Sequence, residues 1–258
     1  MDYQTIRLTE TDGYAVITMT RADVMNALNA QMRAELLHAV KAAEARARAI
    51  VLTGEGRAFC SGQDLGDKSS VATANLERTL RDEYVPLLRA FFDCQVPTIA
   101  AVNGPAAGAG ANLALAADVV IAAERAVFLQ AFTRIGLIPD AGGTYWLPRQ
   151  VGFARAMGAA LFAEPVSAKQ AADWGMIWEA VPDDDFEAHW RRRAAALAAG
   201  PTVAYRQTKE ALRASFSNSL EDQLLLEAKL QGRCGKTRDF REGVLAFLEK
   251  RPAEFEGR

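Results

Sequence analysis

The sequence predicts an α/β fold, and three regions of the chain support that prediction. Alternating apolar residues at 6–8 and 14–19, split by Thr11-Asp12-Gly13, are typical of a β-hairpin. From Asn29 to about residue 123, helical and strand patterns alternate, which indicates βαβ units. Beyond Pro182 the pattern becomes purely helical. With 258 residues, 50% of them hydrophobic, the chain can build one large core and a smaller helical region.

The first helix and the strands of the core follow from periodicity and capping. Asn29 is placed to cap a helix, because Met32, Leu36 and Val40 recur behind it at helical spacing. Short apolar runs predict strands at 50–52, 99–102 and 119–121. Ser167 opens a short helix that Gly175 ends, and residues 176–178 are typical of a late strand.

The last part of the chain is expected to be a set of helices. They lie at 186–199, 202–215, 220–234 and 239–250. Gly200-Pro201 breaks the pattern sharply. We therefore expect a core over residues 1–195 and a C-terminal helical region over residues 196–258.

Composition and charge exclude several classes of function. The chain carries 30 basic and 32 acidic residues, with no long block of one sign, so it lacks the basic footprint of a nucleic-acid or membrane-surface binder. Cys60, Cys94 and Cys234 have neither disulfide nor zinc-site spacing, which is typical of a reducing compartment. No stretch approaches the ~18 apolar residues of a membrane span. We expect a soluble cytoplasmic protein that uses no metal or redox cofactor.

Two turns rich in small residues carry the strongest functional signal. Residues 58–65 and 103–112 each follow an apolar strand, so each can present backbone N–H groups where the sheet ends. Two converging N–H groups form an oxyanion hole, which stabilises negative charge on an acyl oxygen. Residues 108–113 do not fit a dinucleotide-binding motif, because Leu113 stands where the third glycine is required. A tight turn without chemistry is the alternative.

Asp140 is the candidate acid. It lies between a proline and small residues, so a confined apolar pocket would raise the pKa of its carboxyl toward the working pH. The alternative is that Asp140 caps the helix that begins near Gly142. His38 and His189 have no Ser or Cys neighbour that suggests a triad, so we expect structural roles. Cys60 is expected to be a small buried hydrophobe rather than a nucleophile.

Several segments resemble the enoyl-CoA hydratase/isomerase (crotonase) superfamily, in the family's order. They are residues 26–29, 59–65, 102–104, 117–122 and 142–144. The resemblance covers essentially the whole chain. It implies a crotonase-like spiral of ββα units with a C-terminal helical trimerisation region, and an acyl-CoA thioester as substrate. We therefore expect a homotrimer or a dimer of trimers, for which apolar helix faces provide surface at Leu220, Leu224, Leu225 and Leu230.

The resemblance also assigns residues to the site. The two oxyanion donors fall on the N–H groups of Gln63 and Ala109. Adenine, pantetheine and substrate positions of the family fall on Ala58, Ser61, Asp64, Leu65, Gly110, Asn112 and Phe132. Phe247 and Lys250 match C-terminal positions that often reach the CoA of a neighbouring subunit. The wall of the acyl pocket is expected from about residue 71 to 92, as helix and loop.

The chain departs from the hydratases of this family at two positions. Those enzymes use two glutamates to hold and activate water, and the corresponding residues here are Asn112 and Phe132. Asp140 matches the single acidic residue of the family's isomerases. One carboxylate suffices to move a proton between two carbons. The resemblance therefore implies an acyl-CoA isomerase.

A finer resemblance points to the epoxyphenylacetyl-CoA isomerases of phenylacetate degradation. Residues 108–115, 132–140, 172–178 and 241–244 carry it. It implies conversion of ring-1,2-epoxyphenylacetyl-CoA to the seven-membered oxepin-CoA. The alternatives are an aliphatic Δ3,Δ2-enoyl-CoA isomerase, an enoyl-CoA hydratase, and a non-catalytic acyl-CoA-binding protein that keeps the fold.

Overall fold

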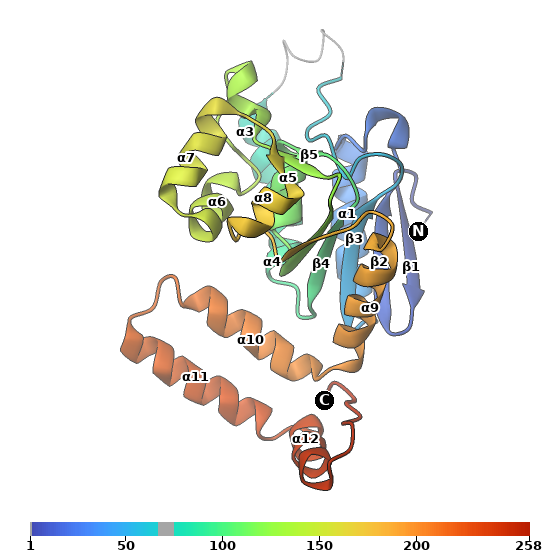
Figure 1. Ribbon diagram of the computed structural model, residues 1–258, viewed down its shortest axis with the longest axis vertical. Helices are drawn as coiled ribbons and strands as arrows, with labels where there is room; N and C mark the ends of the chain where they lie inside the picture. The colour runs from blue at the N-terminus through green and yellow to red at the C-terminus, as the bar shows by residue number, and fades with distance from the viewer. Residues whose placement is uncertain (1, 67–74) are drawn as a thin grey trace.

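A six-stranded sheet forms the centre of the computed structural model, which describes residues 2–66 and 75–258 (Figure 1). Its strands, in spatial order, are β1 (Ile6–Thr11), β2 (Tyr14–Met19), β3 (Ala49–Gly54), β4 (Thr98–Val102), β6 (Val119–Ala123) and β9 (Glu179–Val181). β1 and β2 pair antiparallel as a hairpin, and each later neighbour pairs parallel. The predicted α/β class and the N-terminal hairpin are confirmed.

A second sheet is small and lies beside the functional turns. Within the described residues it has three strands: β5 (Ala106–Ala107), β7 (Val127–Leu129) and β8 (Val166–Ser167). β5 is part of the glycine-rich turn predicted at 103–112, and helix α5 (Ala109–Leu115) follows it directly. This turn is therefore held between two sheets.

Helices cover both faces of the main sheet, because β-strand side chains alternate between the faces. Ile50 and Leu52 of β3 face one core, which α1 (Ala30–Glu44) helps to build, whereas Val51 faces a second core with α9 (Phe186–Ala199). The predicted cap of α1 is present, since Asn29 Oδ1 accepts a hydrogen bond from Met32 N at 2.8 Å. The remaining α-helices of the described ranges are α3 (Leu76–Thr79), α4 (Val85–Phe92), α6 (Gly143–Val151), α7 (Phe153–Phe162), α8 (Ala168–Asp173), α10 (Thr202–Ala214), α11 (Leu220–Cys234) and α12 (Arg238–Glu249).

Three short helices of other types complete the described chain. They are the 3-10 helices η1 (Ala22–Val24) and η3 (Ala131–Ile135) and the π-helix η2 (Leu80–Tyr84). No helix in the described ranges combines the length and the apolar character that crossing a bilayer requires.

The late strand begins three residues after its predicted position. Residues 176–178 were expected to form it, whereas β9 spans Glu179–Val181. Met176 N donates to Ala171 O, so this stretch closes the end of α8, where the side chains of Met176 and Ile177 are buried. Trp178 is 67% exposed, and its N–H donates to Val120 O of β6 at 3.0 Å. An apolar run alone does not distinguish a strand from such a turn.

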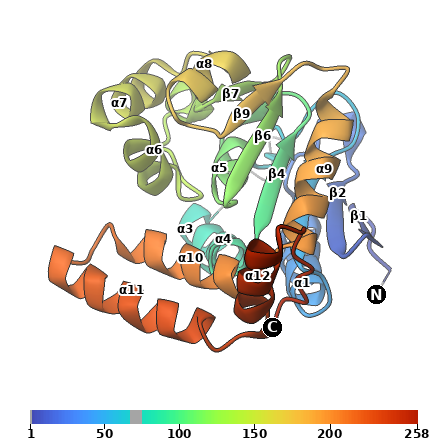
Figure 2. The same ribbon diagram turned by 60° about the horizontal axis from the view of Figure 1, so that its bottom comes forward.

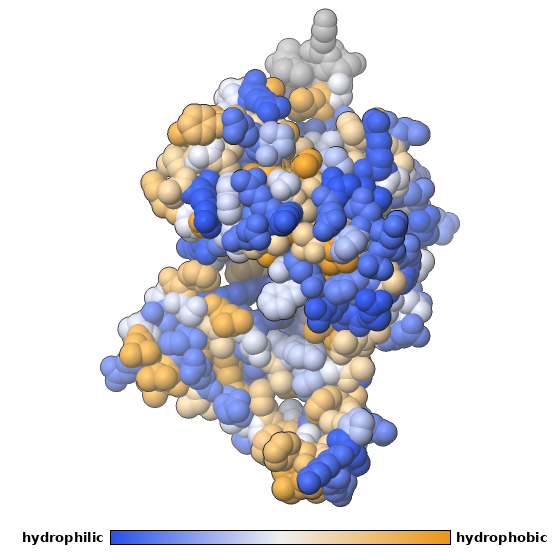
Figure 3. All heavy atoms as spheres, in the orientation of Figure 1, coloured by the Kyte–Doolittle hydropathy of each residue, from blue (hydrophilic) through white to orange (hydrophobic). Residues whose placement is uncertain are grey.

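The C-terminal helices α10, α11 and α12 extend away from the sheet (Figure 2). The predicted boundary near residue 195 falls inside α9, which continues to Ala199. Leu220, Leu224 and Leu225 are 77%, 55% and 66% exposed, whereas Leu230 is buried. Apolar side chains gather over these helices in the lower part of Figure 3.

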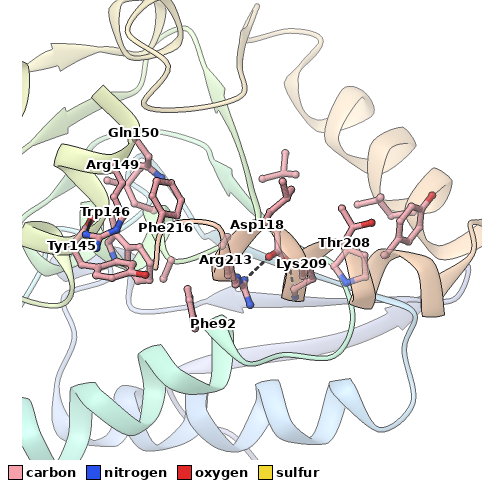
Figure 4. Close-up of a pocket in the computed structure, with 18 residues that line it drawn as sticks. Phe92, Asp118, Tyr145, Trp146, Arg149, Gln150, Thr208, Lys209, Arg213 and Phe216 are labelled. Carbon is pink, nitrogen blue, oxygen red and sulfur yellow. Dashed lines mark hydrogen bonds and ion pairs between the residues drawn. The ribbon is translucent and has the colours of Figure 1, made fainter. Parts of the chain in front are cut away.

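Helix α10 is attached to the core by a largely buried charge cluster, in which Lys209 is the most buried member (Figure 4). Asp118 accepts from Lys209 Nζ at 2.7 Å and from Arg213 Nη2 at 2.6 Å, and Thr98 N donates to the same carboxylate at 2.8 Å. Lys209 Nζ also donates to Val96 O at 2.7 Å. These contacts fix α10 against the ends of β4 and β6.

Candidate active site

The structure brings the two functional turns into direct contact. Cys60 and Ala106 form a parallel β-bridge. Ala107 N donates to Cys60 O at 2.9 Å, and Cys60 N donates to Pro105 O at 3.3 Å. The first turn thus pairs with the second as a short extension of sheet structure, which sets the distance between them.

Two glycines make this approach possible. Gly62 has φ +98°, and a Cβ atom there would lie 2.8 Å from Ala107 O and 3.4 Å from Ala109 N. A Cβ atom at Gly110 would collide with the carbonyl oxygen and side chain of Cys60. Close approach of two backbones is a role that only glycine fills without strain.

Gln63 and Ala109 both line the cavity between these turns. Ala109 is the first residue of α5, so its N–H has no acceptor within the helix. Among the described residues, neither N–H donates to a backbone carbonyl. The cavity has a volume of about 280 Å³. Its lining residues include Ser61, Gln63, Leu65, Leu80, Tyr84, Ala109, Phe132, Leu137 and Asp140.

Asp140 lies on the turn before α6, at the wall of this cavity. Its Oδ1 is buried and has no hydrogen-bond partner among the described residues. Burial raises the pKa of its carboxyl to about 6. The helix cap is Gly142 in the left-handed region, without a side-chain cap, so the alternative that Asp140 caps this helix is wrong. The cavity wall thus includes one desolvated acid and two residues whose backbone N–H groups have no backbone acceptor among the described residues.

The Asn112 side chain is hydrogen-bonded to the turn that carries Asp140. It is fully buried; its Nδ2 donates to the backbone oxygen of Asp140 at 2.7 Å, and its Oδ1 accepts from Gln130 Nε2 at 2.9 Å. Asn112 is not among the described residues that line the cavity. Its side chain therefore orients the turn that carries the acid.

Comparison with known proteins identifies the family. A family model described as enoyl-CoA hydratase/isomerase matches residues 9–258. The chain belongs to this family. A protein of Rhodobacter capsulatus named "Probable enoyl-CoA hydratase" is 66% identical over 258 residues, covering 100% of both chains. The "1,2-epoxyphenylacetyl-CoA isomerase" of Escherichia coli K12 is 44% identical and covers 95% of this chain and 96% of its own.

The fold of the family is confirmed by solved structures. The crystal structure of an enoyl-CoA hydratase from Bacillus anthracis matches with a TM-score of 0.91 at 32% identity, and the match covers 99% of this chain and 100% of that one. The α/β crotonase fold with C-terminal helices is therefore established for this chain. It is an enzyme of the enoyl-CoA hydratase/isomerase family, whose members act on acyl-CoA.

Some of the other site residues assigned from the sequence line this cavity, and others do not. Ser61, Leu65 and Phe132 line the cavity together with Gln63, Ala109 and Asp140. Among the described residues, the lining does not include Ala58, Asp64, Gly110 or Asn112. Asp64 instead pairs with Arg21 at 2.8 Å, and this hydrogen bond lowers the pKa of its carboxyl.

Phe247 and Lys250 are not brought to the cavity of their own chain. They lie at the end of α12, away from the turns (Figure 1). Of the predicted pocket wall, residues 71–74 lie outside the described residues, and the rest is the helix from Leu76 to Phe92.

The histidines and Cys60 have structural environments. His38 is hydrogen-bonded to Tyr3 Oη at 2.9 Å, and His189 Nε2 lies 2.7 Å from Glu179. Cys60 is fully buried, and burial raises the pKa of its thiol to about 12. It is therefore a buried hydrophobe, as predicted. No group of three or more His, Cys, Asp or Glu in the described ranges is arranged to hold a metal ion.

Sequence reasoning missed the residues that surround the Gln63 side chain. Arg33 and Tyr84 both donate to its Oε1, at 2.9 Å and 2.6 Å. In the sequence, Arg33 is indistinguishable from a solvated residue of an amphipathic helix, yet it is only 4% exposed. No local pattern indicates this burial.

Proposed function

We propose that this enzyme is an acyl-CoA isomerase in which Asp140 moves a proton and the N–H groups of Gln63 and Ala109 bind the thioester oxygen. The observation that carries the proposal is the composition of the cavity wall. Among its described residues, Asp140 is the one acid. A single carboxylate serves proton transfer between carbons better than it serves addition of water.

The steps follow from the chemistry of a thioester. The substrate carbonyl accepts hydrogen bonds from the two N–H groups, which lowers the free energy of the enolate. Asp140 in its ionised form removes a proton from the carbon next to the carbonyl, and the electron pair moves to the thioester oxygen. The protonated Asp140 then returns the proton to a more distant carbon as the electron pair shifts back. The atoms of substrate and product are the same.

We propose ring-1,2-epoxyphenylacetyl-CoA as the substrate and oxepin-CoA as the product. In this reaction the ring bond between the two epoxide carbons breaks as the ring electron pairs redistribute, which gives the seven-membered ring, and Asp140 moves the proton from the carbon next to the thioester carbonyl to a ring carbon. The support is the 44% identity to the Escherichia coli protein named for that reaction, together with the apolar and aromatic wall formed by Leu80, Tyr84, Phe132 and Leu137. An aliphatic 3-enoyl-CoA is the alternative substrate for the same proton transfer. Phe247 and Lys250 of a neighbouring subunit would complete the CoA site in a homotrimer or a dimer of trimers.

An enoyl-CoA hydratase is the second candidate, because the 66% identical Rhodobacter capsulatus relative carries that name. Asn112 and Phe132 argue against it. Asn112 is buried behind the Asp140 turn, and Phe132 cannot orient or deprotonate water.

One parallel assay distinguishes these candidates. The purified enzyme is given epoxyphenylacetyl-CoA, a 3-enoyl-CoA and crotonyl-CoA, and turnover is followed by absorbance, with Asp140→Asn as the control. We expect turnover of the first substrate and loss of at least about 10²-fold in the variant, as for a general base. Robust hydration of crotonyl-CoA by the wild type would overturn the isomerase proposal in favour of a hydratase. Preference for the 3-enoyl-CoA would replace the aromatic substrate.

A further inference from the structure

The helix that faces the cavity contains a π-turn. α3, η2 and α4 follow one another without a break from Leu76 to Phe92, and Val85 N–H donates to Leu80 O, five residues back. Pro86 follows immediately. Proline has no N–H, and its ring clashes with the carbonyl of the preceding turn in a regular α-helix. The wider turn accommodates Pro86 and adds one residue to the helix.

The added residue changes which side chain faces the cavity. In a regular α-helix, the residue seven positions after Leu76 shares its face, and that residue is Glu83. With the π-turn, Tyr84 takes this place. Tyr84 is buried and lines the cavity with Leu76 and Leu80, whereas the Glu83 side chain is 37% exposed.

The side chains of Tyr84 and Arg33 both donate hydrogen bonds to the side-chain oxygen of Gln63. Tyr84 Oη donates to Gln63 Oε1 at 2.6 Å, and Arg33 Nη1 donates to that oxygen at 2.9 Å. Arg33 Nη1 also donates to Leu28 O at 2.6 Å, and its Nη2 pairs with Glu83 at 2.6 Å. The guanidinium carbon lies 5.0 Å from the centre of the Tyr84 ring. A half-buried amide oxygen that accepts two such bonds, one of them charge-assisted, has little freedom to move.

We propose that Tyr84 and Arg33 are positioning residues that fix Gln63 by its side-chain oxygen, so that its backbone N–H keeps a constant place in the oxyanion hole. The π-turn at Leu80–Tyr84 brings Tyr84 to that oxygen. This inference rests on the proposed function in one respect, the assignment of Gln63 N–H as a donor to the thioester. Tyr84 acts through Gln63, because its hydroxyl donates to Gln63 Oε1.

The test measures two quantities separately: polarisation of a bound thioester, and the rate of turnover. Cinnamoyl-CoA serves as the probe, because its absorption shifts to the red when hydrogen bonds polarise the thioester carbonyl. The variants are Tyr84→Phe and Gln63→Leu, which each remove one side of the contact, and their double variant. Tyr145→Phe is the matched control, since it removes a hydroxyl from a tyrosine outside the described cavity wall. Circular dichroism verifies that each variant is folded.

We expect a red shift with the wild type and with Tyr145→Phe, and a clearly smaller shift with Tyr84→Phe and Gln63→Leu. kcat should fall about tenfold to 10²-fold in each single variant, with KM changed less than kcat, as for a misplaced catalytic group. The double variant should be no worse than the more impaired single variant, because both remove one contact. A full shift and unchanged kcat in Tyr84→Phe would overturn the positioning role alone. Absence of a shift in the wild type would overturn the donor assignment and the positioning role with it.

Discussion

Asp140 ionises in surroundings that do not stabilise its charge. Its Oδ1 has no partner among the described residues, and burial raises its pKa from 3.8 to about 6. The folded protein therefore binds this proton more tightly than the unfolded chain does. The stabilisation from protonation is complete below pH 3.8, is lost as the pH rises to about 6, and is absent above that value.

Asp140→Asn should therefore stabilise the protein while abolishing catalysis. Asparagine keeps the shape of the side chain without the buried charge, so at pH 8 the variant should melt at a higher temperature than the wild type. The difference should shrink below pH 6 and vanish near pH 4. Thermal unfolding of both proteins across this range measures it. A variant less stable than the wild type at pH 8 would show that the carboxylate has a stabilising partner.

The same pKa predicts the pH dependence of the reaction. Asp140 acts as a base only when ionised, so kcat/KM should rise with pH and level off above about pH 6. Initial rates from pH 4.5 to 8.5 at constant ionic strength provide the measurement. A profile that falls across this interval would assign the essential group to an acid.

At the scale of elements, the attachment of α10 depends on Asp118. Asp118→Asn removes the counter-charge of Lys209, whose side chain is 9% exposed. Breaking a buried pair from one side costs about 3–5 kcal/mol. Urea unfolding of the variant should show a loss of this size. Asp118→Asn combined with Lys209→Met should recover part of it, because the buried charge of Lys209 is gone while the more exposed Arg213 remains without its partner.

The surface pair Arg7–Glu55 supplies the control, since its side chains are 57% and 45% exposed. Glu55→Gln should change the free energy of unfolding by about 0–1 kcal/mol. If Asp118→Asn had an equally small effect, α10 would be attached mainly by its apolar contacts.

The sequence predicts well those elements whose signals are local. Asn29 caps α1 because its side chain bonds three residues ahead, and the strands of the sheet appear as apolar runs between turns. The late strand was misplaced because Met176 and Ile177 are apolar for a different reason, their burial at the end of α8.

In the candidate site too, features with local signals could be predicted and those that depend on distant contacts could not. Gln63, Ala109 and Asp140 lie on turns that the pattern of small residues indicates, and the structure brings them to one cavity. Contacts between Gln63 and the side chains of Arg33 and Tyr84 could not be predicted, because they join residues 30 and 21 positions apart. Only the packing of α1 against the helix of residues 76–92 creates them.

At the scale of the whole molecule, apolar surface on the C-terminal helices predicts assembly. Leu220, Leu225 and Phe247 are 77%, 66% and 82% exposed. Exposed apolar area of this extent is typical of a protein interface. Light scattering should give a mass three or six times the 27.9 kDa of one chain. A fully active monomer at working concentration would contradict both the interface and the role proposed for Phe247 and Lys250 across it.

A charge introduced into this surface should separate assembly from folding. Leu225→Asp should dissociate the oligomer and weaken CoA binding, whereas Lys229→Glu, at an exposed polar position of the same helix, should do neither. If Leu225→Asp left the mass unchanged, the subunits would meet through another face.

The pairing of the two turns through their backbones also affects how the family can evolve. The proposed oxyanion donors are main-chain groups, so a substitution at Gln63 or Ala109 can shift an N–H group but, proline apart, cannot remove it. The acid is a single side chain on another turn, and it can be exchanged, moved or duplicated by point mutation. An ancestor with this scaffold could therefore acquire a new reaction one substitution at a time, without ever passing through a form that had lost its ability to polarise a thioester.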